Sequence, residues 1–210
     1  MRGLVRVGAA VPSLALGNVK ENMKRHLAMM REAKEKHVSI VTFPELSLTG
    51  YTCGDLFFQR RLLDDVTDAL LALKDEMPEG ILAVVGAPLE IEGALYNCAV
   101  VLHKGEIISA VPKTFLPNNG EFYEKRWFQS GDARRDASVA IPKLKTDVCR
   151  QAIFETEDGV RFGIELCEDL WAPLPPSTML SVEGAEIILN LSASNELLSK
   201  REYRQQLISQ

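Results

Sequence analysis

Three residues with reactive side chains each follow an apolar run of the sequence. Glu45 stands in the stretch FPEL, Lys113 in VPKTFLP and Cys167 in ELCEDLW. Side chains that follow strands gather at the edge of a sheet, where α/β proteins build their sites. A carboxylate, an ammonium group and a thiol supply a base, a cation for an oxyanion and a nucleophile. The set therefore predicts nucleophilic catalysis by Cys167.

The neighbours of Cys167 in the sequence do not favour a reactive thiol. Glu165, Glu168 and Asp169 surround it, and negative charge raises the pKa of a thiol and disfavours the thiolate. Residues remote in sequence must therefore activate it, with Glu45 as the proton acceptor and Lys113 offsetting the negative charge. Taken singly, each residue has a simpler interpretation, since a strand-end cysteine is often a small buried apolar residue and surface lysines are common.

The remaining cysteines and histidines give no second site. Cys53, Cys98 and Cys149 form no CxxC pair, so neither a zinc knuckle nor a dithiol redox motif is indicated, and we expect all three to be structural. The three histidines form no Cys–His pair by spacing. No metal site is therefore predicted.

Hydrophobic periodicity predicts the elements that must position the three residues. Apolar runs indicate strands over residues 4–10, 38–43, 81–87 and 186–191. Helical spacing indicates helices over residues 18–36, with Asn18 and Glu21 as an N-cap pair, over residues 62–73 and from about residue 198. Two further strand pairs flank Lys104-Gly105 and Asp158-Gly159 and are predicted to be hairpins.

Composition fits one globular domain of this kind. The chain has 210 residues, of which 46% are hydrophobic and 25% charged. The element order predicts a two-layer α/β domain with a mixed sheet, or two sheets face to face with helices outside. A net charge of −5 argues against nucleic acid or an anionic membrane as a partner. The N-terminal apolar run is too short for a membrane span, and a cytoplasmic protein is expected.

At its three reactive residues the sequence resembles the nitrilase superfamily of carbon-nitrogen hydrolases, whose triad is glutamate, lysine and cysteine in that chain order. FPEL, VPKTFLP and ELCEDLW match its three motifs. Within that superfamily the chain is most similar to the glutaminase domains of glutamine-dependent NAD synthetases. The stretches that carry this similarity are FPELSLTGYTCGDLF, YNCAVVLHKGEI, PKTFLPNNGEFYEKRWF and NLSASNELLSKREYR.

The resemblance implies a fold and a reaction. The fold is a four-layer αββα sandwich of the nitrilase type over residues 1–210, which we expect to be incomplete at its C-terminus. The reaction is hydrolysis of the glutamine side-chain amide to glutamate and ammonia through a thioester on Cys167. Glu45 would be the base, while Lys113 and the backbone N–H of Glu168 would hold the oxyanion.

The resemblance also implies residues for the substrate. Ser194 and Lys200 would meet the α-amino and α-carboxylate ends of glutamine, and Tyr51 and Phe122 would shape the pocket. A second carboxylate beside Lys113 is expected to be either Glu121 or Glu124. The sequence does not choose between these two glutamates.

Partners follow from the same resemblance. Ammonia would pass to an ATP-dependent synthetase domain that converts deamido-NAD to NAD, where ATP and Mg²⁺ would act, and the glutaminase step itself needs no cofactor. The sequence contains no SGG-type phosphate-binding loop, so we expect that domain to be absent from this chain. A homo-oligomer is expected. Two alternatives stay open, namely a carbon-nitrogen hydrolase for another small amide and a non-catalytic assembly module.

Overall fold

The strands form two sheets in a computed structural model that describes residues 4–103, 105–131, 138–141 and 143–209. The larger sheet contains, in order across it, β1 (Val7–Ala9), β2 (Ile40–Thr42), β3 (Leu82–Ile91), β4 (Ala94–His103), β5 (Glu106–Pro112), β7 (Thr146–Cys149) and β6 (Ser138–Ile141). The smaller sheet contains β10 (Ile187–Leu191), β9 (Arg161–Leu166) and β8 (Ile153–Glu155). Both sheets are mixed, with β1, β2 and β3 parallel and β3, β4 and β5 antiparallel.

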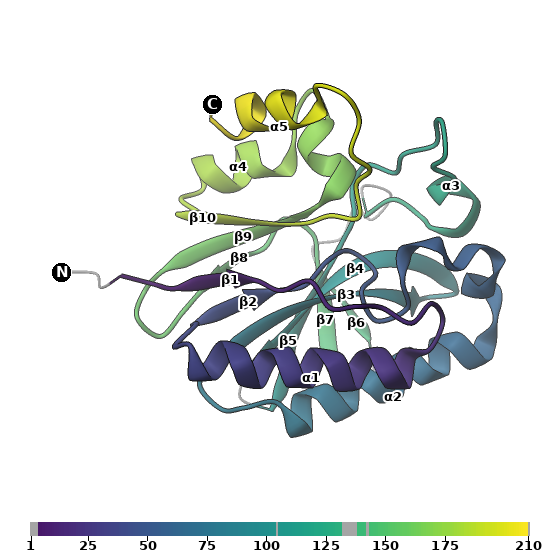
Figure 1. The fold of residues 1–210 in the computed structure, drawn as a ribbon, viewed down its shortest axis with the longest axis horizontal. Coiled ribbons are helices and arrows are strands. Elements are labelled where there is room, and N and C mark those ends of the chain that lie inside the picture. The colour runs from purple at the N-terminus through teal and green to yellow at the C-terminus, as the bar shows by residue number, and fades with distance from the viewer. Residues whose placement is uncertain (1–3, 104, 132–137, 142, 210) are drawn as a thin grey trace.

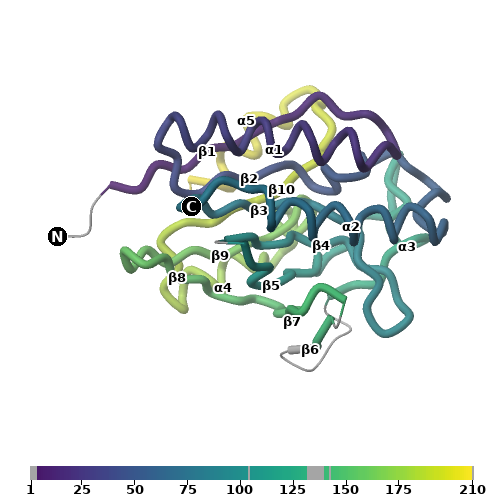
Figure 2. Tube along the Cα trace, turned by 90° about the horizontal axis from the view of Figure 1, so that it is seen from below, coloured from purple at the N-terminus to yellow at the C-terminus, as the bar shows by residue number. Residues whose placement is uncertain are grey.

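Helices cover the outer faces of the two sheets (Figure 1). The α-helices are α1 (Val19–Glu35), α2 (Arg60–Glu76), α3 (Glu124–Trp127), α4 (Pro176–Val182) and α5 (Lys200–Ile208), and the 3₁₀ helices are η1 (Tyr51–Phe58) and η3 (Cys167–Trp171). Helices α1 and α2 lie on the larger sheet, and α4 and α5 lie on the side of the smaller one. This arrangement confirms the predicted αββα sandwich. Figure 2 shows β1 and β6 at opposite margins of the larger sheet.

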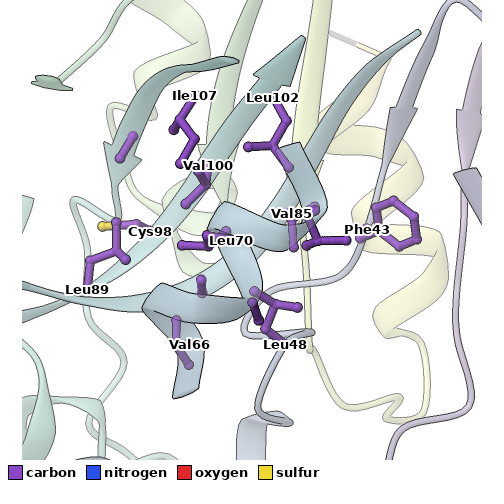
Figure 3. Close-up of a cluster of buried hydrophobic side chains, with 14 of the residues drawn as sticks. Phe43, Leu48, Val66, Leu70, Val85, Leu89, Cys98, Val100, Leu102 and Ile107 are labelled. Atoms are coloured by element: carbon purple, nitrogen blue, oxygen red, sulfur yellow. The ribbon is translucent and has the colours of Figure 1, made fainter. Parts of the chain in front are cut away.

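Two hydrophobic clusters of buried side chains lie between layers of the sandwich. The outer core lies between the larger sheet and the helices α1 and α2, and Figure 3 shows Leu70 of α2 packed against Val85 and Val100 of the sheet. The inner core lies between the sheets. Along β9, Phe162, Ile164 and Leu166 belong to that inner core, whereas Gly163 meets Leu180 of α4, as the alternation of a strand requires.

Most predicted elements are confirmed, with shifted ends. Helix α1 begins after Asn18, whose side chain accepts the backbone N–H of Glu21 at 3.2 Å, but the Glu21 side chain pairs with Arg25 instead of returning to the cap. Both predicted hairpins form, as β4–β5 and β8–β9. Lys104 of the first turn lies outside the described residues.

The predicted end of the third strand at residue 87 is wrong. Strand β3 continues through Pro88 to Ile91 and returns in β4 after a turn in which Glu92 and Gly93 both have positive φ. Strand β2 pairs only with Leu82 to Val84, so the missing N–H of Pro88 removes no ladder bond on that side.

Candidate active site

Glu45 is fixed by a turn that packs directly on the larger sheet. Strand β2 ends at Thr42, and Leu46 adopts a left-handed conformation with φ of 51°. A Cβ on Gly86 of β3 would overlap the backbone of Pro44 and Leu46, so only glycine permits this approach. The Glu45 side chain is thereby buried, with 1% exposure.

Lys113 and Cys167 directly follow β5 and β9, at strand ends of the two different sheets. Lys113 is fully buried, and its backbone N–H donates to the Asn97 carbonyl at 2.8 Å. Cys167 has φ of 43°, a left-handed conformation that is unfavourable for a residue with a side chain. The chain therefore turns sharply out of β9 at the thiol, which is a location typical of a functional constraint.

The structure brings Lys113 between two carboxylates. Its Nζ lies 2.6 Å from Glu45 Oε1 and 2.6 Å from Glu124 Oε1, and all three side chains are buried. Burial alone would lower the pKa of Lys113, but the charges of Glu45 and Glu124 outweigh it and hold that pKa above its usual value. Burial raises the pKa of Glu124, and the charge of Lys113 opposes this rise.

The Cys167 thiol lies beside this cluster and is neutral at rest. Burial and then the charge of Glu45 raise its pKa to about 12, against the opposing effects of Lys113 and of a hydrogen bond from the Ala193 N–H. The Ala193 N–H also donates to Glu45 Oε2 at 3.1 Å. The base, the cation and the nucleophile are thus brought together from three strand ends.

The carboxylates next to Cys167 in sequence have other partners. Asp169 is buried, and its carboxylate accepts backbone N–H groups of Leu166 at 3.0 Å, Thr114 at 3.1 Å and Phe115 at 2.7 Å. Burial raises the pKa of Asp169 to about 7, although these hydrogen bonds oppose the rise. Asp169 therefore ties the turn of Cys167 to the loop of Lys113 across the two sheets. Glu165 accepts the Ser177 N–H at 3.0 Å and the Asn190 amide at 3.1 Å.

The choice between the two candidate carboxylates follows from their placement. Glu124 contacts Lys113 and accepts the hydroxyl of Tyr51 at 2.7 Å. Glu121 is exposed and accepts the side-chain amide of Asn195. Glu124, and not Glu121, is therefore the carboxylate that can orient Lys113.

The residues expected to meet the substrate form two groups. The rings of Tyr51 and Phe122 meet edge to face, with centroids 6.1 Å apart. Lys200 Nζ donates to Ser194 Oγ at 2.7 Å and lies 5.0 Å from the Trp171 ring centroid. Ser194 follows Ala193 in the chain, so the Lys200–Ser194 pair is joined directly to the residue whose N–H contacts Glu45.

Sequence reasoning missed three contributors to the site, namely the side chain of Asn97, the side chain of Asp169 and the backbone N–H of Ala193. Asn97 carried a signal, because a polar residue inside the apolar run YNCAVVL must find a partner when buried. No sequence signal marks the Ala193 N–H, because its role depends only on where the chain after β10 lies.

The other predictions for this chain concern cysteines, metals and membranes. Cys53 and Cys98 are buried in the outer core, and Cys149 is half-buried at the end of β7. Within the described part of the chain, no group of three or more His, Cys, Asp or Glu side chains is placed to hold a metal ion. None of the described helices is long and apolar enough to cross a membrane.

Comparison with known sequences identifies a family and relatives that agree with the resemblance seen in the sequence motifs. A family model described as carbon-nitrogen hydrolase matches residues 6–210. A glutamine-dependent NAD(+) synthetase of Mycobacterium tuberculosis is 36% identical over 208 residues, which cover 98% of this chain and 30% of that protein. The chain thus spans about 30% of the length of such curated relatives.

Comparison with solved structures supports the same fold. A glutamine-dependent NAD(+) synthetase from Cytophaga hutchinsonii superposes with a TM-score of 0.83 at 29% identity, covering 97% of this chain and 33% of the other. An amidase of the nitrilase superfamily from Nesterenkonia superposes with a TM-score of 0.75 at 17% identity, covering 97% and 70% of the two chains. The second similarity concerns the fold alone.

Proposed function

This chain belongs to the carbon-nitrogen hydrolase family, and on that premise we propose that its site hydrolyses the side-chain amide of glutamine through a thioester. The observation that carries the proposal is the buried contact of Lys113 with Glu45 and Glu124 beside the Cys167 thiol. The similarity to glutamine-dependent NAD(+) synthetases supports glutamine as the amide.

In the first half of the reaction, Glu45 takes the proton of Cys167 as the sulfur attacks the amide carbon. Lys113 Nζ and the backbone N–H of Glu168 stabilise the oxyanion that forms on the amide oxygen. Glu45 then gives its proton to the leaving nitrogen, the C–N bond breaks, and ammonia departs from a γ-glutamyl thioester. Glu124 holds Lys113 in place during these steps.

In the second half, Glu45 takes a proton from water, and the resulting hydroxide attacks the thioester carbon. Collapse of the intermediate releases glutamate and returns the proton to the sulfur. Ser194 and Lys200 bind the α-amino and α-carboxylate ends of glutamine, and Tyr51 and Phe122 line the space for its side chain. The contact of Lys200 with Ser194 supports a common role for that pair.

The fate of the ammonia extends the proposal. A synthetase domain would use it to make NAD from deamido-NAD, as the names of the relatives suggest. ATP and Mg²⁺ would act only in that later step, and no cofactor is needed for the glutaminase step. The complete protein would work in the cytoplasm as a homo-oligomer.

The experiment is mass-spectrometric labelling of the intact protein with a glutamine-mimicking diazoketone, with and without excess glutamine. We expect modification at Cys167 alone, suppression by glutamine, and loss of labelling in Glu45→Ala. Cys53, Cys98 and Cys149 serve as internal controls. Glutamate release should fall by several orders of magnitude in Cys167→Ala.

Three outcomes would contradict the assignment. Equal labelling of all four cysteines, or of none, would favour a non-catalytic assembly module. Protection by a different small amide but not by glutamine would favour the other carbon-nitrogen hydrolase. Retention of glutamate release in Cys167→Ala would exclude the proposed nucleophile.

A further inference from the structure

Asn97 of β4 is a buried polar residue that the mechanism above does not use. Its side chain is fully buried, and its Nδ2 donates to Glu45 Oε1 at 2.7 Å and reaches Glu124 Oε2 at 3.5 Å. Its backbone carbonyl accepts the N–H of Lys113 at 2.8 Å. One residue thus contacts all three charged members of the cluster.

The two carboxylate oxygens of Glu45 have different surroundings. Oε1 accepts both Lys113 Nζ at 2.6 Å and Asn97 Nδ2 at 2.7 Å. Oε2 accepts the backbone N–H of Ala193 at 3.1 Å, and Ala193 follows β10, whose Leu191 pairs with Leu166 next to Cys167. Because Ala193 and Cys167 follow paired strand ends, Oε2 faces the edge of the smaller sheet that carries the thiol.

These contacts make the two oxygens unequal as bases. Hydrogen bonds and a positive charge favour the ionised form of the oxygen that receives them, so they reduce its tendency to accept a proton. Oε1 receives a charged donor and an amide donor, whereas Oε2 receives one neutral backbone donor at a longer distance. Oε2 therefore receives the weaker donor and faces the sheet that carries the sulfur.

We infer that Asn97 is a positioning residue that directs Glu45 Oε2, rather than Oε1, to the thiol proton. The inference rests on the proposed amide hydrolysis. In the acylation step the S–H bond breaks, its proton bonds to Oε2, and the sulfur electron pair forms the bond to the amide carbon. Without the Asn97 donor, the carboxylate can rotate about its Lys113 contact and lose alignment with the sulfur.

The test is the pH–rate profile of glutamine hydrolysis by the intact protein and by Asn97→Leu and Asn97→Ala. Asn97→Leu retains nearly the same volume without a donor, and Asn97→Ala removes the donor without adding an apolar chain. We expect kcat to fall by about 10–100-fold with little change in KM, because Asn97 holds the base and not the substrate. The acid limb of kcat/KM should move to higher pH by about one unit, because a donor that favours the carboxylate is lost.

Asn190→Leu is the matched control. Asn190 is half-buried and also donates its side-chain amide to a buried glutamate, Glu165, at 3.1 Å, so its loss removes the same kind of hydrogen bond away from Glu45. The control should lower Tm and leave the acid limb in place. An unmoved acid limb in both Asn97 variants, or a rise in KM with kcat unchanged, would overturn the role of Asn97. A wild-type protein that releases no glutamate would overturn the proposed function instead.

Discussion

At the scale of single residues, the surroundings of Cys167 favour the thiol over the thiolate. Its pKa of about 12 arises first from burial and next from the charge of Glu45, and Lys113 only partly offsets them. At neutral pH the proton must therefore leave during the attack on the amide. Glu45 thus has two opposed effects, since it holds the proton on sulfur at rest and removes it during the reaction.

Replacing Glu45 by glutamine separates these two effects. In Glu45→Gln the pKa of Cys167 should fall below about 12, because the negative charge of Glu45, which together with burial raises it, is gone. Glutamine turnover should nevertheless fall by about 10²–10⁴-fold, because no base remains. The thiolate absorbance, titrated against pH, and the rate of glutamate release measure the two quantities on the same sample.

Glu165→Gln is the control, because Glu165 is a buried carboxylate with no described contact to Lys113. It should leave turnover within a few-fold of wild type. Turnover that rises with the thiolate fraction in Glu45→Gln would contradict general-base catalysis and indicate a preformed thiolate.

Residue types and chain order predict the triad but not its surroundings. Glu45, Lys113 and Cys167 could be identified because each directly follows a strand-like run. The choice of Glu124 over Glu121 could not be predicted, because the two stand three positions apart and only the folded chain decides which one faces Lys113. Contacts between residues 148 positions apart, such as Glu45 with Ala193, leave no local pattern.

At the scale of elements, helix α1 supports the turn of Glu45 from behind. His26 of α1 is buried, with Nδ1 2.7 Å from the Asn22 carbonyl and Nε2 2.9 Å from Ser47 Oγ. Since a carbonyl only accepts, Nδ1 carries the proton and Nε2 accepts the hydroxyl of Ser47. The ring also packs on Phe43, with centroids 4.4 Å apart.

This histidine predicts a loss of stability in mild acid. Burial lowers the pKa of His26 from 6.5 to about 4, so between these values the unfolded chain binds more protons than the folded one. The free energy of unfolding should therefore decrease as pH falls through this range, by up to about 3 kcal/mol from His26. Urea unfolding of wild type and His26→Gln at several pH values measures the difference in slope.

His37→Asn is the matched control, because His37 is an exposed histidine just beyond α1 and its positive φ of 56° suits asparagine. The wild-type slope should persist in this variant and be reduced in His26→Gln. Equal slopes in all three proteins would show that His26 does not limit stability in acid.

Elements were predictable where their pattern is local. The amphipathic spacing of α1 and α2 and the turn residues of the hairpin β8–β9 gave correct elements. The predicted strand was shorter than β3 because a proline normally ends a strand. Pro88 is acceptable inside β3 because the short strand β2 does not extend alongside it. The short strands β6 and β7 went unpredicted, although they pair locally with each other. Their place in the sheet depends on the pairing of β7 with β5, which is remote in sequence.

At the scale of the whole molecule, the site joins the two sheets. Glu45, Lys113 and Glu124 belong to the larger sheet and its loops, whereas Cys167 and Ala193 follow strands of the smaller one. The inner core and the hydrogen bonds of Asp169 set the distance between these groups. Packing between the sheets should therefore affect catalysis more than packing under α1 and α2.

A pair of core truncations tests this difference. Phe162→Ala in the inner core and Leu70→Ala in the outer core should each cost about 2–5 kcal/mol of stability. Only Phe162→Ala should lower kcat by about tenfold or more, since it displaces the sulfur from the base. Thermal unfolding and glutamine turnover, measured well below the lower Tm, give both values. Equal losses of kcat in the two variants would contradict a site governed by the inner core.

The arrangement of the site across two sheets has a consequence during synthesis. During translation, Glu45 and Lys113 are synthesised before Cys167 and Ala193, which emerge only with the strands of the smaller sheet. A nascent chain that has formed the larger sheet alone therefore carries Glu45 and Lys113 without a partner for attack. Hydrolytic competence should arise in a single late event, when the second sheet docks, so a partly made domain consumes none of the cell's amide pool.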